Sequence, residues 1–160
     1  MTIKMLAMDV DGTLTDGSIN TSSEGELFKV FDVKDGYGIR NICEDYGIIP
    51  VIITARESKI VELRSKELGI KEIHQKVRDK GDKLIELASK YGLERDQIAY
   101  IGDDVNDLPA MDFAGMSFAP KDAHEDVKKE VYHVLSSNGG HGAVRECIDF
   151  IVNMIESDRP

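Results

Sequence analysis

The feature that most constrains this chain is an apolar stretch ending in two aspartates and a glycine, Met5-Leu6-Ala7-Met8-Asp9-Val10-Asp11-Gly12-Thr13. Because alternate side chains of a strand point to the same side, we expect Asp9 and Asp11 to face one point where the chain leaves a sheet. Two neighbouring carboxylates repel each other unless a cation lies between them or one keeps its proton. Gly12 permits a sharp turn whose free amides can hold an anion. The stretch therefore predicts a site for Mg²⁺ and a phosphate group; the alternative is a pair of solvated aspartates at a strand end.

Length and composition indicate one cytoplasmic domain that spans residues 1–160. A chain of this length can bury a substantial core, and no apolar run is long enough to cross a bilayer. The N-terminus leads straight into the first expected strand, without a charged leader or a cleavage site. Cys43 and Cys147 lie far apart without the spacing of metal ligands, so we expect two reduced, buried thiols.

The net charge of −10 argues against general nucleic-acid binding, which requires a basic face. The same charge would repel an anionic substrate. A site for a phosphorylated sugar therefore needs local positive charge, supplied by Mg²⁺ and by a few placed lysine and arginine side chains.

Apolar runs typical of buried strands alternate with amphipathic helical patterns along the chain. This alternation predicts a three-layer α/β domain with a mainly parallel sheet, and the Ser/Gly-rich segment 17–31 predicts a hairpin next to Asp9 and Asp11. Strands are expected at 48–53, 70–73, 97–101, 114–120 and 131–135. Helices are expected after the segment 32–40 and up to a stop at Gly47, at 58–68, from about 83 to about 90, at 124–129 and after the glycine loop 138–142.

Two of the expected strands end in further candidate site residues. Thr54 follows strand 48–53, where its hydroxyl can bind a phosphate oxygen, although a Thr at this place can also cap a helix. Strand 97–101 runs into Gly102 and a group of acids, and a third carboxylate near the first two would complete an oxygen cage for a hard cation. These acids are Asp103, Asp104 and Asp107. Lys80 becomes a candidate only in this context, because a single lysine in a charged turn is usually solvated.

Asp9-Val10-Asp11-Gly12-Thr13 resembles the first motif of the haloacid dehalogenase superfamily of phosphotransferases, and the later motifs follow in the order that this superfamily uses. The resemblance implies a Rossmann-like α/β/α fold in which Asp9 is the nucleophile and Asp11 the general acid and base. It also implies that Thr54 and Lys80 hold the phosphoryl oxygens. The implied Mg²⁺ ligands are Asp9, Asp11 and Asp103, and the implied supporting residues are Asp104 and Asp107, the latter beside the metal or Lys80.

Within the superfamily, the chain resembles the 3-deoxy-octulosonate 8-phosphate phosphatases over nearly its whole length. The matching segments are 9–17, 31–40, 75–80, 102–104 and 139–146. This resemblance implies Mg²⁺-dependent hydrolysis of a sugar acid phosphate in lipopolysaccharide biosynthesis, without a cap domain. It also implies a homotetramer in which the hairpin acts as a flap and, with the C-terminal tail, helps to close a neighbour's site.

The residues after Thr54 leave the substrate open between eight and nine carbons. The family commonly has Gly-Arg followed by a basic or polar residue, whereas this chain has Ala55-Arg56-Glu57, which looks more like the phosphatases of nine-carbon sialic-type acid 9-phosphates. Glu57 could instead lie in the first turn of a helix, where an acid is favoured. The candidate substrate-binding residues are Gly12, Arg56, Glu57, Arg64 for the sugar carboxylate, and Arg145, which could also simply pair within its helix.

Two other classes of protein are compatible with parts of this pattern. A receiver domain uses clustered aspartates, Mg²⁺, Thr and Lys, but its acidic pair is adjacent and its phosphoacceptor lies on a later strand. A non-catalytic module linked to sialic acid activation would show a degraded site, whereas all five core site residues are present here: Asp9, Asp11, Thr54, Lys80 and Asp103.

Overall fold

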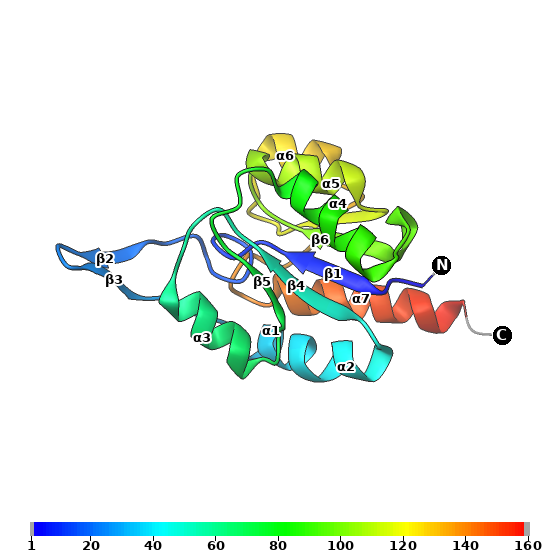
Figure 1. The fold of residues 1–160 in the computed structure, drawn as a ribbon, viewed down its shortest axis with the longest axis horizontal. Helices are drawn as coiled ribbons and strands as arrows, with labels where there is room; N and C mark the ends of the chain where they lie inside the picture. The colour runs from blue at the N-terminus through cyan, green and yellow to red at the C-terminus, as the bar shows by residue number, and fades with distance from the viewer. Residues whose placement is uncertain (1, 159–160) are drawn as a thin grey trace.

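The computed structural model describes residues 2–158, which form a parallel sheet between two layers of helices (Figure 1). The sheet has six strands in the order β5-β4-β1-β6-β7-β8, and every neighbouring pair is parallel. The strands are β1 (Met5–Met8), β4 (Ile49–Ile53), β5 (Glu72–His74), β6 (Ile98–Ile101), β7 (Met116–Ala119) and β8 (His133–Val134). The predicted fold class is therefore confirmed, although β5 begins at Glu72 rather than at Ile70.

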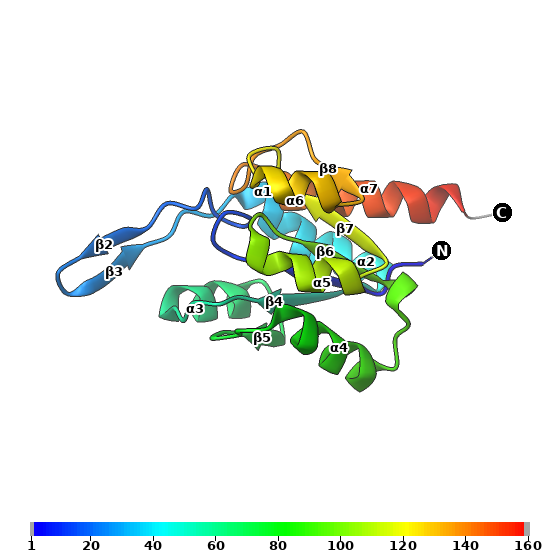
Figure 2. The same ribbon diagram turned by 90° about the horizontal axis from the view of Figure 1, so that it is seen from above.

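The helices divide between the two faces of the sheet (Figures 1 and 2). One face carries α4 (Lys80–Tyr91), α5 (Leu108–Phe113) and α6 (Glu125–Glu130). The other carries α1 (Val33–Tyr37), α2 (Cys43–Tyr46), α3 (Lys59–Glu67) and α7 (Ala143–Ser157), with a π-helical segment Gly38–Ile42 joining α1 to α2. Short 3₁₀ turns, Arg95–Gln97 and Val105–Asp107, flank β6.

Strand alternation builds two separate cores, one on each face of the sheet. In β1, Leu6 and Met8 point toward the cluster that includes residues of α7, whereas Met5 and Ala7 point toward the cluster that includes residues of α4. All four side chains have no exposed surface. A central strand that is apolar on both faces is what a parallel sheet covered by helices requires, and this packing fixes where Asp9 emerges.

The predicted hairpin forms a separate two-stranded sheet that projects from the body of the molecule (Figures 1 and 2). It consists of β2 (Asn20–Ser22) and β3 (Gly25–Phe28), which pair antiparallel. Its apolar residues are exposed in the single chain: Ile19, Leu27, Phe28 and Val30 are each at least half accessible. The hairpin therefore has no apolar core of its own.

The structure also bears on the predicted thiols and on membrane-spanning segments. Cys43 and Cys147 are free and buried, as predicted. Among the described residues, no helix is both long and apolar enough to cross a membrane.

A buried aspartate caps the last helix. The N-cap of α7 is Gly142, which has no side chain to offer, and the carboxylate of Asp35 in α1 accepts the backbone N–H of Arg145 at 2.9 Å instead. Asp35 is 1% exposed, and its second oxygen has no hydrogen-bond partner among the described residues. Burial raises the pKa of Asp35 to about 6, although the Arg145 hydrogen bond opposes that shift.

Replacing Asp35 by Asn should flatten the dependence of stability on pH. The folded state binds the Asp35 proton more tightly than the unfolded state, so this group lowers the free energy of unfolding as pH rises from about 4 to about 6. The free energy of unfolding of Asp35→Asn, minus that of the wild type, should therefore increase by about 2 kcal/mol between pH 4.5 and pH 7. Urea unfolding with a metal chelator, at fixed protein concentration, measures the difference.

Asp45→Asn on the exposed surface of α2 is the matched control and should follow the wild-type curve. Parallel curves for Asp35→Asn and the wild type would show that Asp35 keeps an ordinary pKa.

Candidate active site

The candidate residues meet at the carboxyl edge of the sheet. Asp9, Thr54 and Asp103 follow the adjacent strands β1, β4 and β6 within two residues of each strand's end. Open parallel α/β sheets form their sites at this edge, because the loops of neighbouring strands converge there. Asp9 and Thr54 are buried, and Asp103 is half-buried.

Three carboxylates form a cluster that fits a hard cation. One oxygen each of Asp9, Asp103 and Asp107 lies within 4.8 Å of the others. Asp107 already accepts four hydrogen bonds: Oδ1 accepts from Lys80 and Tyr100, and Oδ2 accepts from the amides of Asp103 and Asp104. Asp9 and Asp103 are therefore the carboxylates that fit Mg²⁺, which prefers oxygen ligands, and Asp107 holds the loop around them.

The turn after β1 places a glycine against this cluster. Gly12 has φ +92°, and a Cβ at this position would lie 1.9 Å from Oδ2 of Asp103. Thr13 donates from Oγ1 to Asp103 Oδ1 at 3.1 Å, and Oγ1 of Thr15 accepts the amides of Gly12 and Gly17. The loop thus holds Asp103 at a spacing that only glycine permits.

Lys80 supplies the local positive charge that we expected at a phosphate site in this acidic chain. It is the first residue of α4 and only 1% exposed, and its Nζ lies 2.9 Å from Asp9 Oδ1 and 2.7 Å from Asp107 Oδ1. Burial alone lowers the pKa of Lys80, but the charges of Asp9 and Asp107 outweigh it and raise the pKa. Lys80 therefore stays protonated and can face a phosphoryl group.

The carboxyl groups carry more negative charge than Lys80 balances. Burial first, and then the charge of Asp107, raises the pKa of Asp9 to about 6. Burial and the charge of Asp9 raise the pKa of Asp103 to about 8. Without a cation, the cluster therefore retains a proton near neutral pH, and a divalent cation would replace it.

Asp11 departs from the strand-alternation prediction. We expected its carboxylate to face the same point as that of Asp9, but β1 ends at Met8 and the chain turns before Asp11. Oδ1 of Asp11 instead accepts from Lys29 Nζ at 2.6 Å, and Asp11 is not in the cluster of metal-binding carboxylates. The structure therefore does not place Asp11 in the carboxylate cluster with Asp9 and Asp103, and the metal-binding and general acid–base roles of Asp11 stay predictions.

The loop after Thr54 corrects two alternative interpretations. The N-cap of α3 is Ser58, so Thr54 does not cap this helix and Glu57 lies before its first turn. The Thr54 amide donates to the His74 carbonyl, and its own carbonyl accepts the amide of Val77. This pairing places Thr54 beside the segment that leads to Lys80.

Two of the remaining substrate-binding candidates, Arg56 and Glu57, are exposed in the loop after Thr54. Arg56 is exposed, and Glu57 pairs with Lys76 at 2.7 Å, where both side chains are exposed. Lys76 has a positive φ of 56°, the only non-glycine residue among those described that does. Asp104 caps the turn after β6 through the amide of Val105.

Arg64 in α3 and Arg145 in α7 make their contacts on the face of the sheet that carries these two helices. Arg64 pairs with Glu67 at 2.9 Å and lies over the ring of Phe31 at 5.7 Å. Arg145 pairs with Asp149 at 2.9 Å and lies over Tyr37. Arg145 thus pairs within its own helix, and contact of either arginine with substrate stays a prediction.

The glycine-rich tail packs on the site loop. A Cβ at Gly139 would lie 1.9 Å from the carbonyl oxygen of Gly12, and the amide of Gly140 donates to the carbonyl of Thr13 at 3.0 Å. The tail therefore supports the loop of its own chain.

Sequence reasoning missed three side chains that hold the site together. Thr13 was in the motif without a role, and Tyr100 was part of a buried strand, yet its hydroxyl donates to Asp107 at 2.6 Å. Lys29 contacts Asp11 from the hairpin. A tyrosine in the middle of an apolar strand, whose hydroxyl needs a partner when buried, was the one available signal.

Comparisons with known proteins agree on one group of enzymes. A family described as haloacid dehalogenase-like hydrolase matches residues 20–148. The 3-deoxy-D-manno-octulosonate 8-phosphate phosphatase of Haemophilus influenzae is 43% identical over 150 residues, which cover 94% of this chain and 83% of that protein. The same enzyme of Yersinia pestis is 41% identical over 150 residues, which cover 94% of this chain and 80% of that protein.

Solved structures show the same similarity. The phosphatase of Moraxella catarrhalis, in complex with magnesium, phosphate and 3-deoxy-D-manno-octulosonate (KDO), superposes with a TM-score of 0.90 at 40% identity, covering 98% of this chain and 94% of that one. The cobalt-bound form of the Haemophilus influenzae enzyme gives a TM-score of 0.91 at 42% identity, covering 95% of this chain and 88% of that one.

Mg²⁺ binding should release protons and strengthen with pH. Because the raised pKa of Asp103 is about 8, the cation competes with a proton below that pH, so the dissociation constant should fall as pH rises from 6 to 8. The change is at most roughly tenfold per pH unit for each proton released. Calorimetric titration in buffers of different ionisation enthalpy measures both the affinity and the number of protons released.

Asp104→Asn is the matched control, since an Asn side chain can still accept the Val105 amide, and it should keep the pH dependence. An affinity that is constant from pH 6 to pH 8 would contradict the raised pKa of the cluster.

Proposed function

Because this chain belongs to the haloacid dehalogenase-like hydrolase family, we propose that it is a Mg²⁺-dependent phosphatase of 3-deoxy-D-manno-octulosonate 8-phosphate. The reaction yields 3-deoxy-D-manno-octulosonate and phosphate. The observation that carries the proposal is the complete Asp9–Asp103–Lys80 arrangement. It occurs in a chain that matches 80% and 83% of the length of two phosphatases of this substrate and is more than 40% identical to them.

The chain's own residues divide the chemistry into two steps. Asp9 attacks the phosphorus atom, the bond to the sugar oxygen breaks, and Asp11 donates a proton to that oxygen. Water then attacks the phosphorus of the aspartyl phosphate while Asp11 takes up its proton, so phosphate leaves and both carboxyl groups are restored.

The phosphoryl group is held by the residues around Asp9. Lys80 and Thr54 bind its oxygens. The Gly12 amide is not available for this role, because it donates to Thr15 Oγ1. Asp107, which also accepts the Tyr100 hydroxyl, fixes the ammonium group of Lys80. When bound by Asp9 and Asp103, Mg²⁺ supplies positive charge that neutralises the phosphoryl oxygens.

The eight-carbon substrate is favoured over a nine-carbon 9-phosphate by the relatives, which are named for the octulosonate. Glu57, the residue that suggested the longer sugar, forms an ion pair with Lys76 between two exposed side chains. A non-catalytic module is disfavoured because all five core residues are present in the sequence, and because Asp9, Asp103 and Lys80 lie together at the carboxyl edge of the sheet.

We also propose a cytoplasmic homotetramer. The support for association is the projecting hairpin, whose apolar side chains Ile19, Leu27, Phe28 and Val30 are exposed in the single chain. The support for a reducing compartment is the pair of buried free thiols. Light scattering of the purified protein counts the subunits directly.

Phosphate release from 3-deoxy-D-manno-octulosonate 8-phosphate, beside a nine-carbon ulosonate 9-phosphate, tests the proposed reaction. We expect Mg²⁺-dependent turnover with a higher kcat/KM for the eight-carbon substrate. Asp9→Asn removes the nucleophile and should lower kcat by roughly 10³-fold or more.

Asp16→Asn, at an exposed position just after the site loop, is the control for a neutral change and should keep its activity. Turnover of the nine-carbon substrate alone would transfer the assignment to that class. Turnover of neither, by folded protein with Mg²⁺, would contradict the proposal.

A further inference from the structure

One lysine of the exposed hairpin is buried against the site. Lys29 follows β3, whose four residues are all exposed, yet the Lys29 side chain is only 3% exposed. Its Nζ lies 2.6 Å from Asp11 Oδ1 and 3.0 Å from Glu26 Oε1. Burial alone lowers the pKa of Lys29, but its bonds to the two carboxylates raise it, so the charge is retained.

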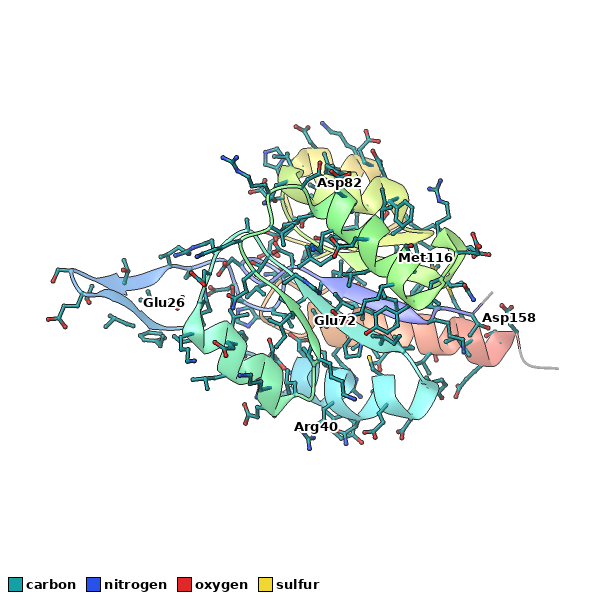
Figure 3. The ribbon with its side chains drawn as sticks, viewed as in Figure 1. Glu26, Arg40, Glu72, Asp82, Met116 and Asp158 are labelled. Atoms are coloured by element: carbon teal, nitrogen blue, oxygen red, sulfur yellow. The ribbon has the colours of Figure 1, made fainter. Side chains whose placement is uncertain are left out.

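Glu26 connects this lysine to a second loop of the site. Ser58 Oγ donates to Glu26 Oε2 at 2.6 Å, and the Ser58 amide donates to Gln75 Oε1 at 2.7 Å. Figure 3 shows Glu26 on the hairpin beside the start of α3. A chain of polar contacts thus runs from Asp11 through the hairpin to the loop after Thr54 and to the segment before Lys80.

We infer that Lys29 is a positioning residue that sets the place of the Asp11 carboxylate. Asp11 lies outside the Asp9–Asp103 cluster, and among the described residues the hydrogen bond from Lys29 is the one that the structure records for its side chain. A charge-assisted bond of 2.6 Å restricts the rotamer of Asp11. Glu26 in turn restricts Lys29, since a buried ammonium group stays where both carboxylates balance it.

This inference rests on the proposed phosphatase activity. It predicts that loss of Lys29 affects two substrates unequally, whereas general damage to the fold would affect both substrates equally. An alkoxide leaving group, as in a sugar phosphate, must be protonated as it departs, whereas p-nitrophenolate departs without a proton. If Lys29 positions Asp11 as the general acid, its loss must slow hydrolysis of the sugar phosphate far more than hydrolysis of p-nitrophenyl phosphate.

The test compares kcat/KM of Lys29→Met for 3-deoxy-D-manno-octulosonate 8-phosphate and for p-nitrophenyl phosphate. We expect a fall of roughly 100-fold for the sugar phosphate, in the range of general acid catalysis, and of less than tenfold for the aryl ester. Lys29→Arg keeps the charge and the donors and should recover part of the loss on the sugar phosphate. Lys59→Met, an exposed lysine on α3, should match the wild type on both.

Glu26→Gln is the second variant, because it loosens Lys29 without removing it and should show a smaller loss with the same substrate dependence. Thermal unfolding and light scattering establish that each variant is folded and assembled. Equal losses on both substrates, or no loss on either, would overturn the positioning role and leave the phosphatase assignment intact. A wild type that hydrolyses neither substrate would overturn the proposed function itself.

Discussion

The burial of Lys80 between two carboxylates is the interaction on which the rest of the site depends. An ammonium group that is 1% exposed is costly unless it is paired, and Asp9 and Asp107 pair it at 2.9 and 2.7 Å. These three residues come from the position directly after β1, from the turn after β6 and from the start of α4. The charge balance of one lysine therefore requires these segments to converge, and the apolar cores on both faces of the sheet hold them in that arrangement.

Local sequence patterns are sufficient to predict which edge of the sheet carries the site. Asp9, Thr54 and Asp103 follow apolar runs, so the edge at which they meet could be predicted from strand direction alone. The direction of the Asp11 side chain could not be predicted, because alternation ends with β1 at Met8. The cap that Asp35 provides and the contact that Lys29 makes join segments far apart in the chain, which leave no periodic signal in the sequence.

The hairpin combines an exposed apolar surface with a contact to the site. Its apolar side chains are exposed in the single chain, whereas Lys29 at its base contacts Asp11. Exposed apolar surface of this kind is typical of an interface. Association of subunits through the hairpin would therefore also constrain the base from which Lys29 reaches the site, so that assembly and catalysis would depend on the same segment.

In the proposed reaction, the phosphoryl group passes through a covalent bond to Asp9. Acid quenching during turnover of 3-deoxy-D-manno-octulosonate 8-phosphate, followed by mass spectrometry of the peptides, detects this intermediate. We expect one phosphoryl group on the peptide of the first strand, located at Asp9 and absent from Asp9→Asn. A phosphoryl group on another residue, or none while phosphate is being released, would contradict the proposed reaction.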